Sequence, residues 1–99
     1  MNKQQVANLL GLAQRAGRII SGEELVVKVI QEGKAKLVFL AHDAAPNLSK
    51  KINDKSHYYQ VDVSTVFSTL ELSSAIGKAR KVLAITDAGF TKKMRSIMQ

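Results

Sequence analysis

The stretch GRIISGEELVVKVIQEG, residues 17–33, decides the fold, because it reads as a short apolar strand that turns directly into an amphipathic helix. Apolar residues recur on one predicted helical face and polar residues on the opposite one. The apolar face holds Leu25, Val26, Val29 and Ile30, and the polar face holds Glu24, Lys28 and Gln31. Ser21 and Glu24 have the spacing of a capping box, which predicts that Ser21 begins the helix. Gly33 supplies the residue that ends it.

The start of this predicted helix is the first candidate binding site. The first turn of a helix has unpaired backbone N–H groups and the positive end of the helix dipole, which together favour phosphate. Gly22 has no Cβ, so the backbone of a ligand can come close to it. We therefore expect an anionic group to bind at the Ser21–Gly22 turn.

Helices and strands alternate along the rest of the chain. The predicted strands are residues 19–20, 37–41, 58–63 and 82–86. A first helix carries Val6, Leu9, Leu10 and Ala13 inward between Asn2 and Gly17, and a third begins at Pro46. Helical stripes over residues 63–70 and 71–77 and a last helix over residues 90–97 complete the pattern. This alternation predicts one domain, residues 1–99, of α/β class, with helices on both sides of a largely parallel or mixed sheet.

Two further side-chain placements follow from these periods. Tyr58 and Tyr59 alternate across the predicted third strand, so one of them should pack inward and the other should be exposed. Val27 lies beside Glu24 and Gln31 on the polar face of the predicted helix, so we expect it to be exposed to a partner or a neighbouring loop.

The composition favours a polyanionic partner. The 99 residues include 15 Lys and Arg against 8 Asp and Glu, a formal charge of +7, and nucleic acid is the first candidate. There is no cysteine, which excludes disulfides, thiol nucleophiles and cysteine-bound zinc. No apolar run approaches the ~18 residues of a membrane span or has the form of a signal peptide. We expect a cytoplasmic protein with no membrane partner.

The residues that could carry out catalysis or bind a metal lack the partner residues that such sites require. His42 and His57 lie fifteen positions apart, and neither is tied to a carboxylate pair or a serine motif. Gly33-Lys34 and Gly77-Lys78 lack the other residues of a phosphate-binding loop. The ligand spacing around His42 and Asp43 does not suit a metal. The sequence predicts no catalytic residues, no metal, no cofactor and no small-molecule substrate.

Several separated motifs together resemble one known family. They read Gly17-x-Ile19-x-x-Gly22 with Lys28 six positions later, Gly33-x-Ala35-Lys36-Leu37-Val38, Ala41-x-Asp43-Ala44-x-Pro46, and Glu71-Leu72-x-x-Ala75-x-Gly77. The chain resembles, over nearly its whole length, the kink-turn-binding ribosomal protein family of the L-seven-Ae/L-thirty-e type. It is most similar to the bacterial YlxQ-type members.

This resemblance implies a three-layer α/β/α sandwich with a mixed four-stranded sheet, no catalytic activity, and binding to RNA kink-turns. Gly22 matches the turn glycine of the family and Lys28 matches its lysine. Lys78, Ala79 and Arg80 fall in a second loop that covers the RNA. The usual Asn-Glu pair of the family falls on Glu24 and Leu25, although Glu24 or Glu23 can still accept hydrogen bonds from a guanine edge.

The basic residues of three loops could be gathered on one side of such a fold, or could be scattered surface charge. They are Arg18, Lys34, Lys36, Lys78, Arg80 and Lys81. Glu24 is either a base reader or part of a cap, and Lys28 is either a phosphate contact or a solvated charge. The predicted RNA-binding set is Arg18, Ser21, Gly22, Glu23, Glu24, Lys28, Lys34, Lys36, Lys78, Ala79 and Arg80.

Two functions are compatible with these residues. The first is a monomeric RNA-binding protein of ribosomal type, whose partner is ribosomal RNA or another bent, structured RNA. The alternative is a protein-interaction module of the same fold that has lost the base-reading pair. In that case Glu23, Glu24, Leu25 and Val27 would form the partner surface.

Overall fold

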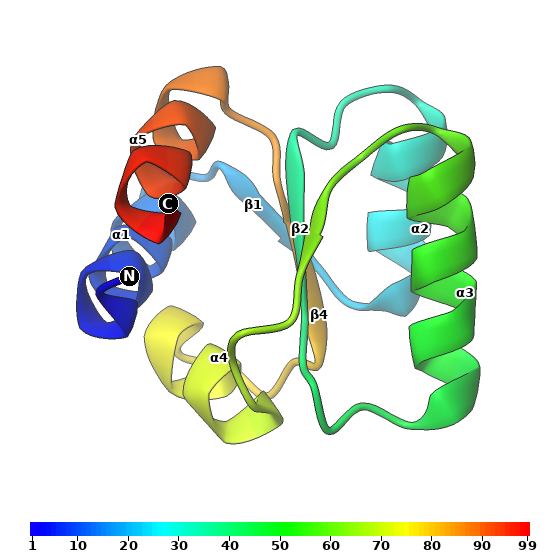
Figure 1. Ribbon diagram of the computed structural model, residues 1–99, viewed down its shortest axis with the longest axis horizontal. Helices are drawn as coiled ribbons and strands as arrows, with labels where there is room; N and C mark the ends of the chain where they lie inside the picture. The colour runs from blue at the N-terminus through cyan, green and yellow to red at the C-terminus, as the bar shows by residue number, and fades with distance from the viewer.

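A computed structural model describes all residues of the chain, 1–99, as five helices around a four-stranded sheet (Figure 1). The elements in chain order are α1 (Lys3–Arg15), β1 (Ile19–Ser21), α2 (Glu23–Gln31), β2 (Leu37–Leu40), α3 (Pro46–Tyr58), β3 (Val63–Ser64), α4 (Thr69–Ile76), β4 (Val82–Ile85) and α5 (Ala88–Met98). Helices α1, α4 and α5 cover one face of the sheet, while α2 and α3 cover the other. The predicted three-layer α/β/α sandwich is confirmed.

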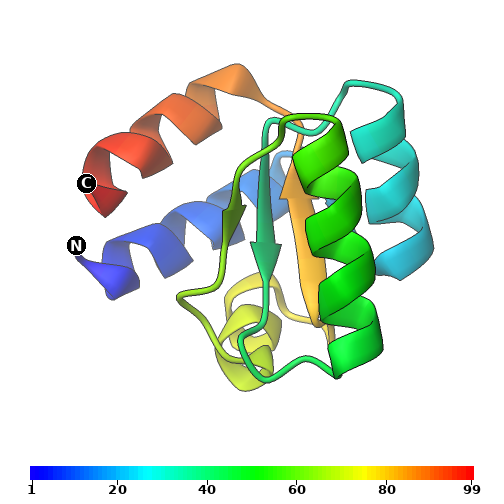
Figure 2. The same cartoon turned by 45° about the vertical axis from the view of Figure 1, so that its right-hand side comes forward.

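The sheet is mixed, in the order β1-β4-β2-β3. The central strand β4 runs antiparallel to both β1 and β2, and β3 lies parallel to β2. Strands β1, β2 and β3 therefore share one direction, and β4 runs against them. Figure 2 shows the arrow of β4 opposed to those of β2 and β3. Ser21 pairs with Leu83, and this register sets the end of β1 beside the start of β4.

The core consists of two apolar clusters, one on each face of the sheet. Leu83 and Ile85 point toward α1, α4 and α5, whereas Val82 and Ala84 point toward α2 and α3. This is the alternation that a strand requires when both of its faces are covered. The strands predicted over residues 37–41 and 82–86 correspond to β2 and β4, and every residue of these two strands is buried. None of the helices has the length and apolar content that crossing a membrane requires.

The third strand is much shorter than predicted. Helix α3 continues to Tyr58, because Ile52 and Ser56 lie buried at helical spacing, and the turn after it has Gln60 at a left-handed φ of 59°. Only Val63–Ser64 pairs with β2. The predicted helical stripe over residues 63–70 is wrong, since pairing with β2 holds the first of these residues extended and α4 begins at Thr69.

The two tyrosines end a helix and do not alternate across a strand. Tyr58 and Tyr59 are both exposed, so the predicted inward packing of one of them is wrong. Their ring centroids lie 4.8 Å apart at an interplanar angle of 73°. This is the edge-to-face geometry that aromatic pairs favour.

Helix α2 is rotated relative to the prediction. Leu25, expected in the core, is 55% exposed. Val27, expected at the surface, is half-buried and packs against the cluster under α2 and α3. The residues of α2 that are buried are Val26, Val29 and Ile30. The salt bridge from Glu23 to Lys51, 3.0 Å long, shows that the side of α2 holding Glu23 and Val27 faces α3.

The predicted capping box at Ser21 and Glu24 is wrong. Ser21 is the last residue of β1, and Gly22 is the N-cap of α2 without a side-chain hydrogen bond. A capping box forms instead at the start of α4. There the Glu71 backbone N–H donates to Ser68 Oγ at 3.1 Å, and the Ser68 N–H donates to Glu71 Oε1 at 2.9 Å.

Replacing the cap of α4 should lower the stability of the protein. We expect Ser68→Ala to reduce the free energy of unfolding by about 1 kcal/mol, since a backbone N–H at the helix start loses its acceptor. The measurement is urea denaturation followed by circular dichroism. Ser74→Ala, in the exposed middle of the same helix, is the matched control and should change little. Equal losses for the two variants would contradict the assignment of the cap.

Candidate nucleic-acid interface

Gly22 adopts a backbone conformation that favours glycine strongly. Its φ of 96° and ψ of 150° lie in a region that side chains with a Cβ rarely enter. Its N–H donates to Val82 O at 3.1 Å, which ties the turn to β4. The nearest atom to a Cβ built here is Arg80 Nε at 3.9 Å. The turn is therefore set by backbone conformation, and one side chain lies close over it.

Arg80 joins the loop between α4 and β4 to this turn. Its Nε donates to Ser21 Oγ at 3.1 Å, and its Nη1 donates to the carbonyl of Ala79 at 2.8 Å. Its backbone is held from the other side by Ser73 of α4. The Ser73 hydroxyl donates to Arg80 O at 3.2 Å and accepts from Arg80 N at 3.1 Å. Hydrogen bonds to Ser21 and Ala79 thus hold the guanidinium beside Gly22, while Ser73 holds the backbone of Arg80.

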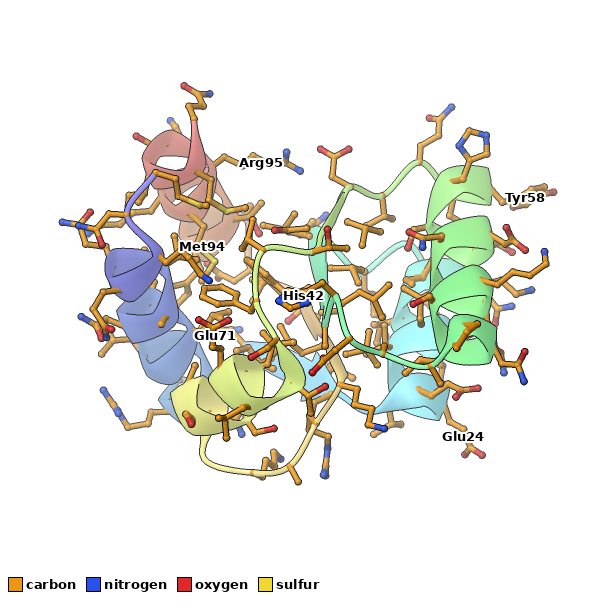
Figure 3. The ribbon with its side chains drawn as sticks, turned by 60° about the horizontal axis from the view of Figure 1, so that its bottom comes forward. Glu24, His42, Tyr58, Glu71, Met94 and Arg95 are labelled. Carbon is orange, nitrogen blue, oxygen red and sulfur yellow. The ribbon has the colours of Figure 1, made fainter.

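The loop that follows β2 completes this end of the sheet. Ala41 N donates to Lys81 O at 2.8 Å, and His42 N donates to Phe67 O at 3.0 Å. Figure 3 shows His42 near the middle of this end, with Glu24 pointing outward from the start of α2. We call this surface, made by the Ser21–Gly22 turn and the 77–81 and 41–45 loops, the Gly22 end.

Asp43 stabilises the same loop. Its Oδ1 accepts from Thr69 Oγ1 at 2.7 Å and from Thr69 N at 2.9 Å. These hydrogen bonds, the one from the hydroxyl first, hold the pKa of Asp43 below its ordinary value of 3.8. The carboxylate therefore links the loop after β2 to the start of α4.

Two helices start at the Gly22 end without a side-chain cap. The N-caps of α2 and α3 are Gly22 and Ala45, and neither supplies a side-chain hydrogen bond. By contrast, Asn2 caps α1 and Asp87 caps α5. The first-turn N–H groups of α2 consequently face outward with the positive end of the helix dipole, as an anion site requires.

The net charge is concentrated partly at this end. Six ion pairs engage six of the 15 basic residues and six of the 8 acids. Nine cations and two acids, Glu24 and Asp43, lie outside ion pairs and account for the charge of +7. Three of these nine cations, Lys78, Arg80 and Lys81, belong to the single loop beside Gly22. Glu24 and Lys28 are four positions apart on α2, a spacing that allows an ion pair, but they do not form one.

The structure brings only part of the predicted site together. The Gly22 end holds Ser21, Gly22, Glu23, Glu24, Lys78, Ala79 and Arg80, while Lys28 is exposed further along α2. Arg18, Lys34 and Lys36 lie at the opposite end of the sheet. The expectation that all three basic loops share one side is therefore wrong. Arg18 and Lys36 precede β1 and β2, which run in the same direction, whereas Gly22 follows β1.

Sequence reasoning missed the residue that positions Arg80. Ser73 lies seven positions before Arg80, on a helix whose serines show no pattern that separates one from another. The pairing of Lys51 with Glu23 at the start of α2 was not predicted either. Contacts of this kind depend on how helices pack, and no local signal indicates them. No group of three or more potential metal ligands is present.

The sequence of the chain matches the model of one known protein family. The model of the Ribosomal protein L7Ae/L30e/S12e/Gadd45 family matches residues 4–95. The chain belongs to this family. The match confirms the resemblance that the separated motifs indicated, and it includes both the Gly22 turn and the 77–81 loop.

Relatives at higher identity cover nearly the whole chain. The chain is 49% identical to RNA-binding protein YlxQ of Enterococcus faecium, over 99% of this chain and 95% of that protein. It is 50% identical to RNA-binding protein YlxQ of Bacillus subtilis, over 91% of each. Large ribosomal subunit protein eL30 of Spodoptera frugiperda is 32% identical, over 87% of this chain and 79% of that protein. These relatives are named as RNA-binding or ribosomal proteins and not as enzymes, as predicted.

Solved structures show the same fold. A Bacillus halodurans protein of unknown function superposes with a TM-score of 0.89 at 42% identity, covering 95% of this chain and 96% of that one. A Giardia lamblia 15.5 kD RNA binding protein superposes with a TM-score of 0.82 at 21% identity, covering 96% and 82%. The second likeness supports the fold alone.

The backbone conformations of Gly22 and Gly33 predict different losses of stability when each is replaced by asparagine. We expect Gly22→Asn to lower the free energy of unfolding by about 1–3 kcal/mol, because an asparagine is strained at this φ and ψ. Gly33 has a left-handed φ of 74°, which asparagine tolerates, so Gly33→Asn should cost much less. Urea denaturation of both variants makes the comparison. A smaller loss at Gly22 than at Gly33 would contradict this account of the turn.

The Asp43 contacts predict a dependence of stability on pH. Because folding lowers the pKa of Asp43, its contribution is present above the ordinary value of 3.8 and is lost as pH falls below it. At about pH 6, Asp43→Asn should have a lower melting temperature than the unaltered protein. Between about pH 6 and about pH 3, its melting temperature should fall by a smaller amount. Glu24→Gln, which removes a carboxylate with no hydrogen bond, should follow the unaltered protein. An equal fall in Asp43→Asn would contradict the role of Asp43.

Proposed function

We propose that this protein binds RNA and that the Gly22 end holds a bent, structured RNA of the kink-turn type. The observation that carries the proposal is the contact between two loops distant in sequence. Arg80 of the 77–81 loop lies on Ser21 and beside Gly22, next to the uncapped start of α2. The names of the two YlxQ relatives, both RNA-binding proteins, support RNA as the partner.

Phosphate contacts account for most of the expected affinity. The backbone N–H groups at the start of α2 suit a phosphate oxygen, and so do the side chains of Lys78, Arg80 and Lys81. Arg80 is held in one orientation before RNA arrives, so less side-chain entropy is lost on binding. A backbone-directed site of this kind recognises the shape of an RNA rather than a long sequence.

Base contacts come from the first turn of α2. Glu24 points outward and forms no ion pair, so its carboxylate is available to accept hydrogen bonds from a guanine edge. Leu25 offers an apolar side chain at the position where the family usually has an acid, and it can pack on a base or a ribose. Glu23 is less available, because Lys51 already pairs with it.

The alternative function, a protein-interaction module, is weakened by the position of one of the four residues predicted to form its partner surface. Val27 is half-buried and packs against the cluster under α2 and α3, so it offers a partner little surface. The exposure of Leu25 is the observation that still favours this alternative, since a large apolar side chain at the surface can also meet a protein.

A gel-shift experiment separates the two functions. We expect the protein to shift a kink-turn RNA at lower concentration than a twin RNA whose tandem G·A pairs have been replaced, because only the first adopts the bend. The double variant Lys78→Ala/Lys81→Ala should weaken the kink-turn complex, and Lys93→Ala on α5 serves as a control. Equal binding to both RNAs, or binding to neither, would favour the protein-interaction module.

The role of Lys28 can be tested through salt. A plot of log affinity for the kink-turn RNA against log salt concentration should be linear, and Lys28→Ala should flatten it by about one unit for one lost phosphate contact. Lys93→Ala should leave the slope unchanged. An unchanged slope and affinity in Lys28→Ala would remove Lys28 from the interface.

A further inference from the structure

One serine of α4 anchors the 77–81 loop at two points. The carbonyl of Ser73 accepts from Gly77 N at 2.9 Å, where the helix ends. The Ser73 hydroxyl accepts from Arg80 N at 3.1 Å and donates to Arg80 O at 3.2 Å. The chain from Gly77 to Arg80, at the lower end of the sheet in Figure 1, is therefore tied at both of its ends to a single residue of a helix.

The Ser73 hydroxyl is already occupied by this loop. A serine hydroxyl has a single O–H to donate, and Arg80 O accepts it. The oxygens of an ionised phosphate only accept hydrogen bonds, so Ser73 could donate to one only by releasing Arg80 O. Ser73 is therefore placed to hold the loop and not to contact an RNA phosphate.

Arg80 is the residue on which this anchor acts. Because its N and O atoms both bond to Ser73, the direction in which its side chain leaves the loop is fixed. From there, Nε reaches Ser21 Oγ at 3.1 Å and Nη1 reaches the carbonyl of Ala79 at 2.8 Å. The Nη2 group forms no hydrogen bond within the protein, so it remains available to a phosphate oxygen.

The order of Arg80 before binding has a consequence for affinity. Immobilising one long, flexible side chain during binding weakens a complex by roughly two- to tenfold. The hydrogen bonds from Ser73, Ser21 and Ala79 impose this order on Arg80 when the chain folds. Without the anchor at Ser73, RNA would have to supply part of it.

We propose that Ser73 is a positioning residue for RNA binding, which raises the affinity of the Gly22 end by holding Arg80 over the Ser21–Gly22 turn before RNA arrives. The inference rests on the function proposed for that end. It extends the determinants of affinity from the loops that contact RNA to the helix behind them.

The first test measures affinity for the kink-turn RNA over a range of salt concentrations. Ser73→Ala should bind roughly fivefold more weakly, because Arg80 is then ordered during binding. Its log-log salt slope should equal that of the unaltered protein, since no cation is lost. Arg80→Ala should instead flatten the slope by about one unit for its lost phosphate contact.

Two variants serve as controls for the loss of the hydroxyl. Ser73→Thr, which keeps a hydroxyl at this position, should bind more tightly than Ser73→Ala and close to the unaltered protein. Ser74→Ala, at the exposed neighbouring position of α4, should leave affinity unchanged. Circular dichroism checks that each variant is folded at the temperature of the binding measurement.

A double variant tests whether Ser73 acts through Arg80. Ser73→Ala/Arg80→Ala should bind the kink-turn RNA as Arg80→Ala does, because the anchor has no guanidinium left to position. Losses that add in the double variant would overturn the proposal, since Ser73 would then support the fold in general.

A measurement without RNA provides an independent readout. In nuclear magnetic resonance spectra of the free protein, the Arg80 Nε–H should exchange slowly with solvent, and Ser73→Ala should speed this exchange. Unchanged exchange in Ser73→Ala would overturn the proposal. A preference for the kink-turn RNA that Ser73→Ala retains at full affinity would refute the positioning role alone. Equal binding of the kink-turn RNA and its G·A-replaced twin by the unaltered protein would refute the function proposed for the Gly22 end, and the positioning role with it.

Discussion

Antiparallel pairing of β1 with β4 is the interaction on which the rest of the structure depends. It places Ser21 opposite Leu83 and lets Gly22 N–H reach Val82 O. The chain that enters β4 must then pass beside the turn that leaves β1. Arg80 consequently meets Ser21 across 59 positions of sequence, and a loop with three cations is held against the start of α2. The candidate interface is a product of strand register.

The sequence predicted what depends on local pattern. The apolar runs of β2 and β4 and the helical period of α1 indicated a buried sheet covered on both faces, and the motifs indicated its mixed order. The cap of α2 could not be found in this way. Ser21 has the spacing of a capping residue, but the ladder with β4 keeps it in the strand and Arg80 occupies its hydroxyl. Tertiary pairing overrode a local signal, while the same signal was correct at Ser68.

The distribution of charge follows from chain direction. A loop before a strand and the loop after it lie at opposite ends of a sheet, so Arg18 could not share a surface with Gly22. Parallel β1 and β2 then place Lys36 with Arg18. The pattern of elements was sufficient for this conclusion once strand directions were known. The contact of Ser73 with Arg80 was beyond such reasoning, because it depends on the packing of α4 against the sheet.

The most direct test of the central claim is a map of backbone amide shifts by nuclear magnetic resonance as a kink-turn RNA is added. The account predicts that the largest changes fall on Ser21, Gly22 and the first turn of α2, together with Lys78 to Lys81. Amides of α1 and α5 should stay in place. Large changes confined to α1, α4 or α5, with the Gly22 turn unaffected, would contradict it.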